Sequence, residues 1–416
     1  MFRNAHARPQ AYNWGSPSVH PFTYEQARAC VIAESLRIAA ANRAAEIVPL
    51  LEAAGRVLAQ EILADRDYPA TARSMRDGFA IHAEDIPGTL EVIGEVRAGE
   101  RWNGPALRQG QALEIMTGAP MPVGANAVVM IEHTTRDGST IMTDRTHLPG
   151  DNFNPQGSEA RLGSAVLHRG RRLTFADIAQ LATVGVAQVP VYPRPTVAIL
   201  ATGDEVIGVE DAPQDFQVRN SNSYSLAIQV KRAGGLPRIL EVASDVYEHT
   251  RAQVELGLQS DLLLLSGGVS AGKYDIVEKV LADLGATFFF DRVRVQPGQP
   301  LVFGEAHGKL FFGLPGNPAS TMVTFEVFAR AAVEILSGNP APGLPLAWAP
   351  LTHNFHHKAG LRRFLPAVVE DGAVTHVKWF GSSDVSALSR ANAFLVADAK
   401  KAEYKQGEMI QVLFYE

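Results

Sequence analysis

Hydrophobic residues recur at three- and four-residue steps near the start of the chain, which predicts an amphipathic helix. Thr23 and Gln26 have the spacing of a capping box, and the apolar positions that follow are Ala27, Val31, Ile32, Leu36 and Ala39. A second helix-like stretch covers residues 50–59. From residue 65 to about 166 the pattern changes to short apolar runs between Gly, Pro, Asn and Asp, such as LEVIGEV at 90–96. Such runs are typical of a β-rich region.

Short strands alternate with amphipathic helices from about residue 196 onward. The expected strands are residues 197–200, 238–242, 262–265 and 310–312, and the expected helices are residues 222–233, 247–258, 275–284 and 318–337. Repeated strand–loop–helix units predict an α/β domain with a mostly parallel sheet and with ligand loops at the carboxyl ends of its strands. The Pro-rich segment 339–350 is typical of a linker. Residues 351–416 contain alternating strand-like runs and no clear helical pattern. This last pattern favours a small β-barrel or sandwich.

Composition and charge exclude several classes of protein. The 416 residues are too many for one hydrophobic core, so we expect about two to four domains. With 46% apolar and 20% charged residues, the chain is neither disordered nor a collagen or coiled coil. The net charge of −6 gives no overall basic field to hold nucleic acid or an anionic membrane. Cys30 is the only cysteine, which excludes a disulfide framework and a zinc site built from cysteines.

The N-terminal segment lacks the apolar core of a secretory signal. No window approaches the roughly eighteen consecutive apolar residues of a membrane-spanning helix. We therefore expect a cytoplasmic protein in which residues 1–20 form a flexible leader.

The glycine-rich loop after residues 262–265 nearly matches a phosphate-binding P-loop. Gly267, Gly272 and Lys273 stand at the required positions, between an expected strand and an expected helix. Tyr274 follows them, however, where magnesium coordination needs a small hydroxyl. This departure argues against an ATPase or GTPase.

The same loop also reads as the nucleophile elbow of a serine hydrolase. Residues 268–272 have the pattern G-x-S-x-G with Ser270 as the nucleophile, and the candidate bases downstream are His307, His353, His356 and His357. The Gly-Gly pair before Ser270 and the nearby Asp275 suit phosphate and metal binding at least as well. A tight turn that simply needs glycines is a third reading, and all three stay open on this loop alone.

Two further loops offer groups for a cation and an anion. Asp204 and Glu205 follow the strand 197–200, where adjacent carboxylates suit a hard cation such as Mg²⁺. Residues 313–318, Gly-Leu-Pro-Gly-Asn-Pro, lead into a helix whose first N–H groups are open to an anion. Each loop alone is also ordinary turn chemistry. Together with Asp275, which falls at the same edge of a parallel sheet, they suit a magnesium–phosphate pair.

Several short segments in chain order carry a resemblance to one family. They are SMRDGFA at 74–80, IMTGAP at 115–120, TGDE at 202–205, NSN at 220–222, SGGVS at 266–270 with Asp275, PG at 297–298, GLPGNP at 313–318, RRF at 362–364 and GSS at 381–383. With these segments the chain resembles the molybdopterin molybdenumtransferases of the MoeA type, which are related to the E domain of gephyrin. The resemblance covers the chain from about Pro21 to its C-terminus.

The resemblance implies an enzyme of molybdenum cofactor biosynthesis. Members of the family insert molybdenum from molybdate into adenylylated molybdopterin and release AMP, with a divalent cation such as Mg²⁺. They are elongated homodimers of four domains, and their substrate points to the molybdopterin adenylyltransferase as a further partner. The corresponding domains here are an extended linking and dimerisation domain (21–65 with 166–190, its first helix free to pack on the α/β domain), a β-rich domain (66–165), a molybdopterin-binding α/β domain (191–340) and a C-terminal β-barrel (341–416).

The family's site residues carry over by motif, and the active cleft would be shared between two subunits. The residues implied in catalysis are Asp77, Thr117, Glu159, Asp275, Arg292 and Arg362, with Asp77 and Thr117 reaching across to the partner's loops. The residues implied in binding molybdopterin, its phosphate or molybdate are Asn222, Ser266, Gly267, Gly268, Ser270, Gln296, Pro315, Gly316, Asn317, Pro318 and Ser383. The residues implied in holding the cation are Asp204, Glu205 and Asp275.

This chain departs from the family around the expected anion site. Gln296 and Gln299 stand where the family often has lysines, and amides supply no net charge to an oxyanion. Ser158 and Glu159 stand where the family has Glu-Asp, so Arg292, Arg294 and Arg362 would have to compensate. The alternatives are a catalytically weakened paralogue that binds molybdopterin or inserts another oxyanion such as tungstate, and a serine hydrolase centred on Ser270.

Overall fold

The computed structural model of the protein describes residues 21–41, 44–268 and 276–415. The chain forms two compact units. One contains the described residues of segments 1–48, 55–59 and 190–416, and the other contains segments 49–54 and 60–189. The finer division into four domains stays a prediction.

A six-stranded sheet forms the centre of the first unit. Its strands, in spatial order, are β16 (Leu236–Ile239), β13 (Thr196–Ala201), β17 (Leu262–Ser266), β21 (Lys309–Leu314), β20 (Pro300–Ala306) and β18 (Thr287–Arg292). The first four strands are parallel to one another, β20 is antiparallel to β21, and β18 is antiparallel to β20. The predicted mostly parallel sheet is therefore confirmed, with an antiparallel pair at one edge.

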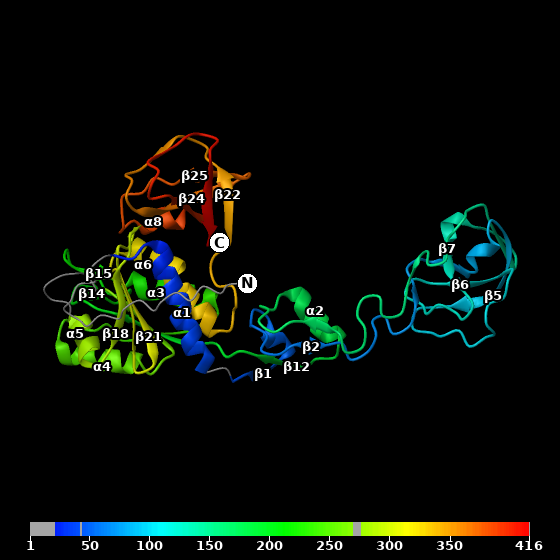
Figure 1. Ribbon diagram of the computed structural model, residues 1–416, viewed down its shortest axis with the longest axis horizontal. Helices are drawn as coiled ribbons and strands as arrows, with labels where there is room; N and C mark the ends of the chain where they lie inside the picture. Colours follow the sequence, from blue (N-terminus) through cyan, green and yellow to red (C-terminus); the bar gives the residue numbers. More distant parts are fainter. Residues whose placement is uncertain (1–20, 42–43, 269–275, 416) are drawn as a thin grey trace. The chain divides into compact units, whose positions relative to one another are not determined.

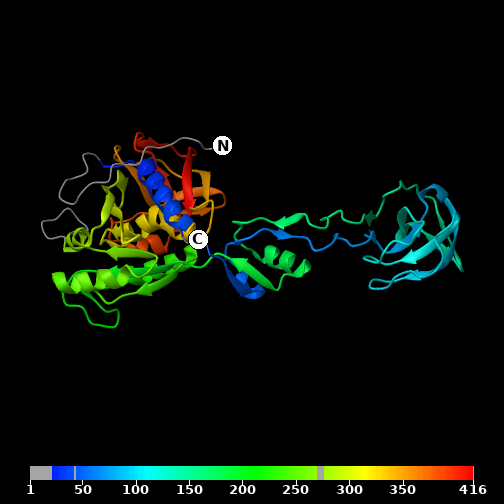
Figure 2. The same cartoon turned by 60° about the horizontal axis from the view of Figure 1, so that its bottom comes forward.

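Helices cover both faces of this sheet, as Figures 1 and 2 show. One face packs against α1 (Tyr24–Ala41), α3 (Ser221–Ala233) and the continuous helix made of α6 (Pro318–Thr324), a π-helical turn (Phe325–Ala329) and α7 (Arg330–Leu336). The other face packs against α4 (Tyr247–Gly257) and α5 (Ile276–Asp283). Successive leucines of β17 enter these two cores alternately, so the strand reads as an unbroken apolar run.

The C-terminal part of the first unit is a second, mostly antiparallel sheet. Its spatial order is β19 (Val295–Gln296), β24 (Arg362–Glu370), β26 (Ala393–Ala397), β28 (Met409–Phe414) and β22 (Leu346–Pro350), with β25 (Ala373–His376) beside β24. β23 (Phe355–His356) and β27 (Glu403–Tyr404) form a small pair. A short helix, α8 (Val385–Ser389), begins after Asp384, whose side chain accepts the amide N–H of Ala387. No helix was expected there, because five residues are too few to show helical periodicity. That these strands close into a barrel stays a prediction.

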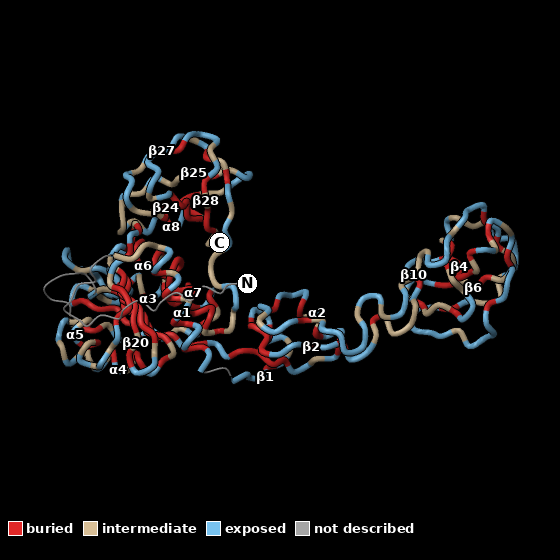
Figure 3. Tube along the Cα trace, in the orientation of Figure 1, coloured by how far each residue is buried: buried red, intermediate tan, exposed pale blue. Residues whose placement is uncertain are grey.

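The two sheets of the first unit share a core. Phe364 and Phe394, on one face of the C-terminal sheet, belong to the same buried cluster as α1, α6 and α7, whereas Leu365 and Leu395 pack on the opposite face. Alternation along β24 and β26 therefore attaches this sheet to the α/β core. Figure 3 shows the buried residues concentrated along β20, α7 and β28.

The second unit is rich in β-structure. Its main sheet has the order β7 (Ala127–Met130), β4 (Gly78–Ile81), β6 (Gln111–Ile115), β5 (Gly88–Val96), β9 (Thr140–Thr143) and β8 (Thr135–Asp137). The shorter pairs are β10 (Phe153–Asn154) with β3 (Arg73–Ser74) and β11 (Ala165–Leu167) with β2 (Ile62–Leu63). The helix α2 (Phe175–Thr183) begins with a capping box between Thr174 and Asp177.

The prediction of a helix over residues 50–59 is wrong, because the helical segment there is much shorter. The structure has only one 3₁₀ turn there, Leu50–Ala53. Gly55 follows with φ +75°, a conformation that ends helical structure. The strands β1 (Glu46–Pro49) and β12 (Gln188–Val191) form a two-stranded sheet. Within the described residues, none of the helices has the length and apolar character needed to cross a lipid bilayer.

Candidate functional site

Loops at the carboxyl ends of β13, β17 and β21 form one wall of a cavity of about 670 Å³. Further lining comes from β14 (Val206–Ile207), β15 (Val218–Arg219), the start of α3 and the C-terminal domain. The lining residues are Ala201, Thr202, Glu205, Val206, Val218, Arg219, Asn220, Ser221, Asn222, Ser266, Gly267, Gly268, Pro300, Pro315, Gly316, Asn317, Pro318 and Ser383. Ligand sites in open α/β sheets lie at this end of the strands.

Close backbone packing explains the glycines of the β17 loop. Gly267 and Gly268 have φ values of +92° and +63°. A Cβ on Gly267 would lie 2.8 Å from the Thr202 carbonyl oxygen, and one on Gly268 would lie 2.8 Å from the Thr202 hydroxyl. The glycines therefore allow the β13 and β17 loops to touch. A Cβ on Gly316 would lie 3.5 Å from the Cα of Gly267, so the β21 loop is in contact with them too.

Asn222, in the first turn of α3, joins two of these loops. Its Nδ2 donates to the Ser266 hydroxyl at 2.7 Å and to the Gly316 carbonyl at 2.8 Å. Because a carbonyl can only accept, the Gly316 contact fixes which end of the amide is nitrogen. Asn220 accepts the Ser223 amide N–H at 3.1 Å and so caps α3. The polar residues of the NSN motif thus hold the cavity wall.

The C-terminal domain contributes to the β21 loop. The Asn317 amide donates to the Ser382 hydroxyl at 2.9 Å, and the Ala319 N–H donates to the Ser382 carbonyl at 2.9 Å. Ser383 is then placed in the cavity wall. The amide N–H groups of Gly316 and Asn317 have no hydrogen-bond partner among the residues that the structure describes. These amides are available to an anionic ligand.

Two charged side chains line the cavity among the described residues, Glu205 and Arg219. The Arg219 Nε donates to the Asp211 carbonyl at 3.0 Å. Asp204, which precedes Glu205, does not line the cavity, because its carboxylate accepts the Asp245 N–H at 3.0 Å. Adjacent residues of this turn therefore point in different directions.

The expected cation site is described only in part. Asp275, like Ser270, lies outside the described residues. Within the part of the chain that is described, no group of three or more His, Cys, Asp or Glu side chains could hold a metal ion. Glu205 supplies the chemistry of a hard-cation ligand at the cavity wall, whereas Asp204 belongs to a neighbouring turn.

Asp77 and Thr117 lie together in the second unit. The Thr117 amide N–H donates to the Asp77 carboxylate at 2.6 Å. This N–H, and then the Thr117 hydroxyl, lower the pKa of Asp77 below its ordinary value. Arg73 holds the same turn by donating to the Gly118 carbonyl at 2.8 Å. The SMRDG and IMTGAP motifs therefore form one surface that carries an ionised carboxylate. Glu159 is an exposed residue of this unit whose backbone N–H donates to the Tyr68 carbonyl.

Other expected site residues of the first unit lie outside the cavity wall. Arg292 ends β18, and its carbonyl accepts the Phe22 amide. Gln296 lies in β19 opposite Arg363 of β24. Neither is a lining residue, although Pro300, which follows the same loop, is one.

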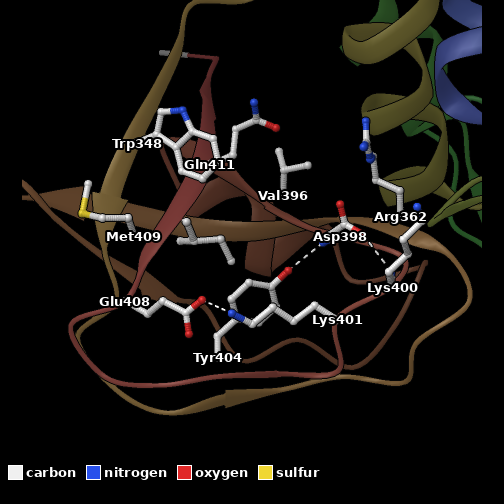
Figure 4. A pocket seen from close by; sticks show the side chains of 11 residues that line it. Trp348, Arg362, Val396, Asp398, Lys400, Lys401, Tyr404, Glu408, Met409 and Gln411 are labelled. Atoms are coloured by element: carbon white, nitrogen blue, oxygen red, sulfur yellow. Dashed lines mark hydrogen bonds and ion pairs between the residues drawn. The ribbon is translucent and has the colours of Figure 1, made fainter.

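Arg362 lines a second cavity, of about 430 Å³, on the C-terminal sheet. It pairs with Glu25 at 2.7 Å, and its guanidinium lies 4.9 Å from the centre of the Tyr24 ring. Figure 4 shows Arg362 and Lys400 at one end of this cavity, with Trp348, Gln411 and Met409 toward the other.

Arg219, Thr202 and Pro300 line the cavity but are not among the site residues predicted from the sequence. Thr202 is the first residue of the TGDE motif and Arg219 directly precedes the NSN motif, and these positions are the signal that could have found them. Pro300 directly follows Gln299, a position noted near the expected anion site, but its place in the wall depends on how the loop after β19 returns to the sheet.

Three family models match the chain in order. The MoeA N-terminal region (domain I and II) matches residues 22–185, the probable molybdopterin binding domain matches residues 198–335, and the MoeA C-terminal region (domain IV) matches residues 348–415. These matches confirm the resemblance seen in the motifs.

Similar proteins extend over most of the chain. The molybdopterin molybdenumtransferase of Bacillus subtilis is 37% identical over 387 residues, which cover 88% of this chain and 89% of that protein. Molybdopterin molybdenumtransferase 2 of Mycobacterium tuberculosis is 33% identical over 382 residues, which cover 88% of this chain and 94% of that protein. The crystal structure of the molybdopterin biosynthesis moeA protein from Pyrococcus horikoshii OT3 has a TM-score of 0.82 at 29% identity, and it covers 95% of this chain and all of that one. The chain therefore belongs to the MoeA family of molybdopterin molybdenumtransferases.

Proposed function

We propose that this protein inserts molybdenum from molybdate into adenylylated molybdopterin and releases AMP, as a step of molybdenum cofactor biosynthesis in the cytoplasm. The observation that carries the proposal is the cavity at the carboxyl ends of β13, β17 and β21 in a chain of this family. Its wall combines free backbone amides, the hydroxyls of Ser266 and Ser383, and one arginine. These are the groups that bind phosphate and tetrahedral oxyanions.

Each loop has a distinct task in this proposal. The amides of Gly316 and Asn317 bind oxygens of the phosphate or of molybdate, and Asn222 keeps the Ser266 and Gly316 loops at a fixed spacing. Pro315 and Pro318 stiffen the loop, so the amides are positioned before substrate arrives. A bound divalent cation such as Mg²⁺ would neutralise phosphate charge, and Glu205 is the described residue placed to hold it, with Asp204 and Asp275 as further candidates.

We further propose that the active protein is a homodimer, in which Asp77 and Thr117 of one subunit complete the cavity of the other. Hydrogen bonds from Thr117 keep the Asp77 carboxyl ionised, so it acts as a carboxylate in the insertion step. A molybdopterin adenylyltransferase would supply the substrate. Glu159, Arg292 and Arg362 stay candidates for catalytic support.

The test is the release of AMP from adenylylated molybdopterin when molybdate is added to the purified protein with Mg²⁺. We expect AMP to appear only when the protein and molybdate are both present, with tungstate tested in parallel. Tight binding of the substrate without AMP release would instead identify a catalytically weakened paralogue. Labelling by an activity-based serine probe would support a hydrolase, which the comparisons do not favour.

A further inference from the structure

Arg219 is the one cationic side chain in the described wall of the cavity. It ends β15 and directly precedes Asn220, the cap of α3. The family resemblance suggested Arg292 and Arg362 for the positive charge, but neither lines this cavity among the described residues. The charged residues that line the described wall, where a substrate with a phosphate or another oxyanion would bind, are therefore Arg219 and Glu205.

The Arg219 guanidinium is held from one side only. Its Nε donates to the Asp211 carbonyl at 3.0 Å, and pairing of Arg219 with Ile207 fixes the backbone beneath it. Within the described part of the chain, no carboxylate forms an ion pair with Arg219, whereas Arg362 is paired with Glu25. Among the described residues, the N–H donors of Nη1 and Nη2 are therefore not used by another group.

Gln296 and Gln299 supply no positive charge to this cavity. Gln296 pairs along its backbone with β24, and neither glutamine lines the cavity. Arg294, the other cation considered as a replacement, donates to the Gly360 carbonyl at 3.2 Å on the C-terminal domain. Among the described residues, positive charge in the cavity therefore depends on Arg219.

We propose that Arg219 is a specificity-determining residue that binds the tetrahedral oxyanion of the substrate in this cavity. The inference rests on the proposed function and names the residue that recognises the anion there. A guanidinium presents two parallel N–H groups to a phosphate or a molybdate, which an ammonium or an amide does not. The adenylate phosphate and molybdate share this chemistry, and measuring each ligand separately distinguishes them.

The experiment measures the affinity of the full-length protein for AMP and for molybdate by calorimetry at low and high salt. The variants are Arg219→Gln, Arg219→Lys and the control Arg238→Gln, which removes the same charge from the exposed edge strand β16. We expect Arg219→Gln to weaken one of the two ligands by roughly tenfold or more and to reduce the salt dependence of its binding. Arg219→Lys should lose less affinity than Arg219→Gln, and Arg238→Gln should bind both ligands as tightly as the wild type.

A second measurement avoids variants altogether. Phenylglyoxal modifies exposed arginines, and mass spectrometry reports the modification at Arg219 and Arg238 in the wild-type protein. We expect AMP or molybdate to protect Arg219 and to leave Arg238 unprotected.

The outcomes separate this inference from the proposed function. If the wild type binds a ligand, but Arg219→Gln binds it equally and Arg219 is not protected, the inference is wrong while the function stands. If the wild type binds neither AMP nor molybdate, the proposed function and the inference both fail. If Arg219→Gln binds only AMP more weakly, Arg219 recognises the adenylate phosphate. If it binds only molybdate more weakly, Arg219 recognises molybdate.

Discussion

The side-chain amide of Asn317 donates a hydrogen bond of 2.9 Å to the hydroxyl of Ser382, a residue of the C-terminal domain. The carbonyl of Ser382 also accepts the Ala319 N–H, at the start of α6. Two contacts thus attach the Gly381–Asp384 turn to the β21 loop, and the next residue, Ser383, lines the cavity. The C-terminal domain therefore takes part in positioning the site.

Removing the Ser382 hydroxyl should loosen the loop and leave the fold intact. Ser382→Ala keeps the backbone contact to Ala319 and loses only the bond to Asn317, which is worth about 1 kcal/mol. We expect AMP or molybdate to bind several-fold more weakly, with a melting temperature lowered by no more than a few degrees. Ser382→Thr retains a hydroxyl and should restore much of the affinity. Equal affinities for the wild type and Ser382→Ala would show that this contact has no part in positioning the site.

Replacing Gly267 by alanine should lower the stability of the protein more than the same replacement at Gly308, a glycine in an open turn. Gly308, between β20 and β21, has φ +76° with nothing near its would-be Cβ, so Gly308→Ala should cost about 1 kcal/mol of backbone strain. Gly267→Ala adds a contact of 2.8 Å with the Thr202 carbonyl and should cost roughly 2–3 kcal/mol. Chemical denaturation of both variants measures the difference. Equal losses would contradict the close approach of the two loops.

Asp77→Asn should remove the negative charge of this side chain while leaving the fold of the second unit intact. The Asn side chain can still accept the Thr117 N–H through its oxygen, so the fold should persist. Under the proposed role of the carboxylate, we expect turnover to fall by roughly a hundredfold or more. The control is Asp137→Asn, on the exposed strand β8. Wild-type rates of AMP release in Asp77→Asn would remove Asp77 from the mechanism.

Two half-buried histidines should make the C-terminal domain acid-sensitive. Burial, and secondly the nearby His353, lower the pKa of His376 below its ordinary value of 6.5. Burial also lowers the pKa of His357. The unfolded chain takes up protons below about pH 6.5 and the folded domain resists them, so the free energy of unfolding should decrease as the pH falls through this range.

Denaturation midpoints on either side of pH 6.5 measure this effect. The control is His376→Phe, which keeps an aromatic ring against Phe355. In the wild type the ring centres of Phe355 and His376 lie 5.2 Å apart. We expect a smaller pH dependence in this variant. An unchanged pH dependence would exclude His376 as a source of the acid sensitivity.

Cys30 should be inert in the folded protein. Cys30 lies on the buried face of α1, and its burial in the core, and then the charge of Glu34, raise the pKa of this thiol to about 12. Because thiolate is the reactive form, iodoacetamide should label the native protein far more slowly than the protein unfolded in guanidinium. Cys30 is the only cysteine, so the labelled fraction is read directly by mass spectrometry. Similar labelling rates in both states would contradict the packing of α1.

The sequence was informative where a single physical rule decided the structure. The apolar run Leu262 to Leu265 predicted a strand, and both faces of β17 are indeed covered. The repeated strand–loop–helix units around it predicted that the sheet is mostly parallel. Parallel strands place their carboxyl ends at one edge. The loops holding Ser266, Gly316 and Glu205 could therefore be expected to meet, and all three residues line one cavity.

Side-chain direction could not be predicted in the same way. Asp204 and Glu205 are chemically similar neighbours, and only the contact with Asp245 shows that Asp204 turns aside. Arg362 lies in a second cavity because Tyr24 and Glu25, far away in sequence, pack beside it. Such long-range contacts have no signature in local periodicity.

The most direct test of the central claim is a crystal of the full-length protein soaked with molybdate and Mg²⁺, with data collected on both sides of the molybdenum absorption edge. We expect an anomalous peak in the cavity between Gly267–Gly268 and Pro315–Pro318, within reach of Arg219 and of the amides of Gly316 and Asn317. A peak only in the second cavity, near Arg362 and Lys400, or no peak in a crystal whose solution sample binds molybdate, would contradict the account.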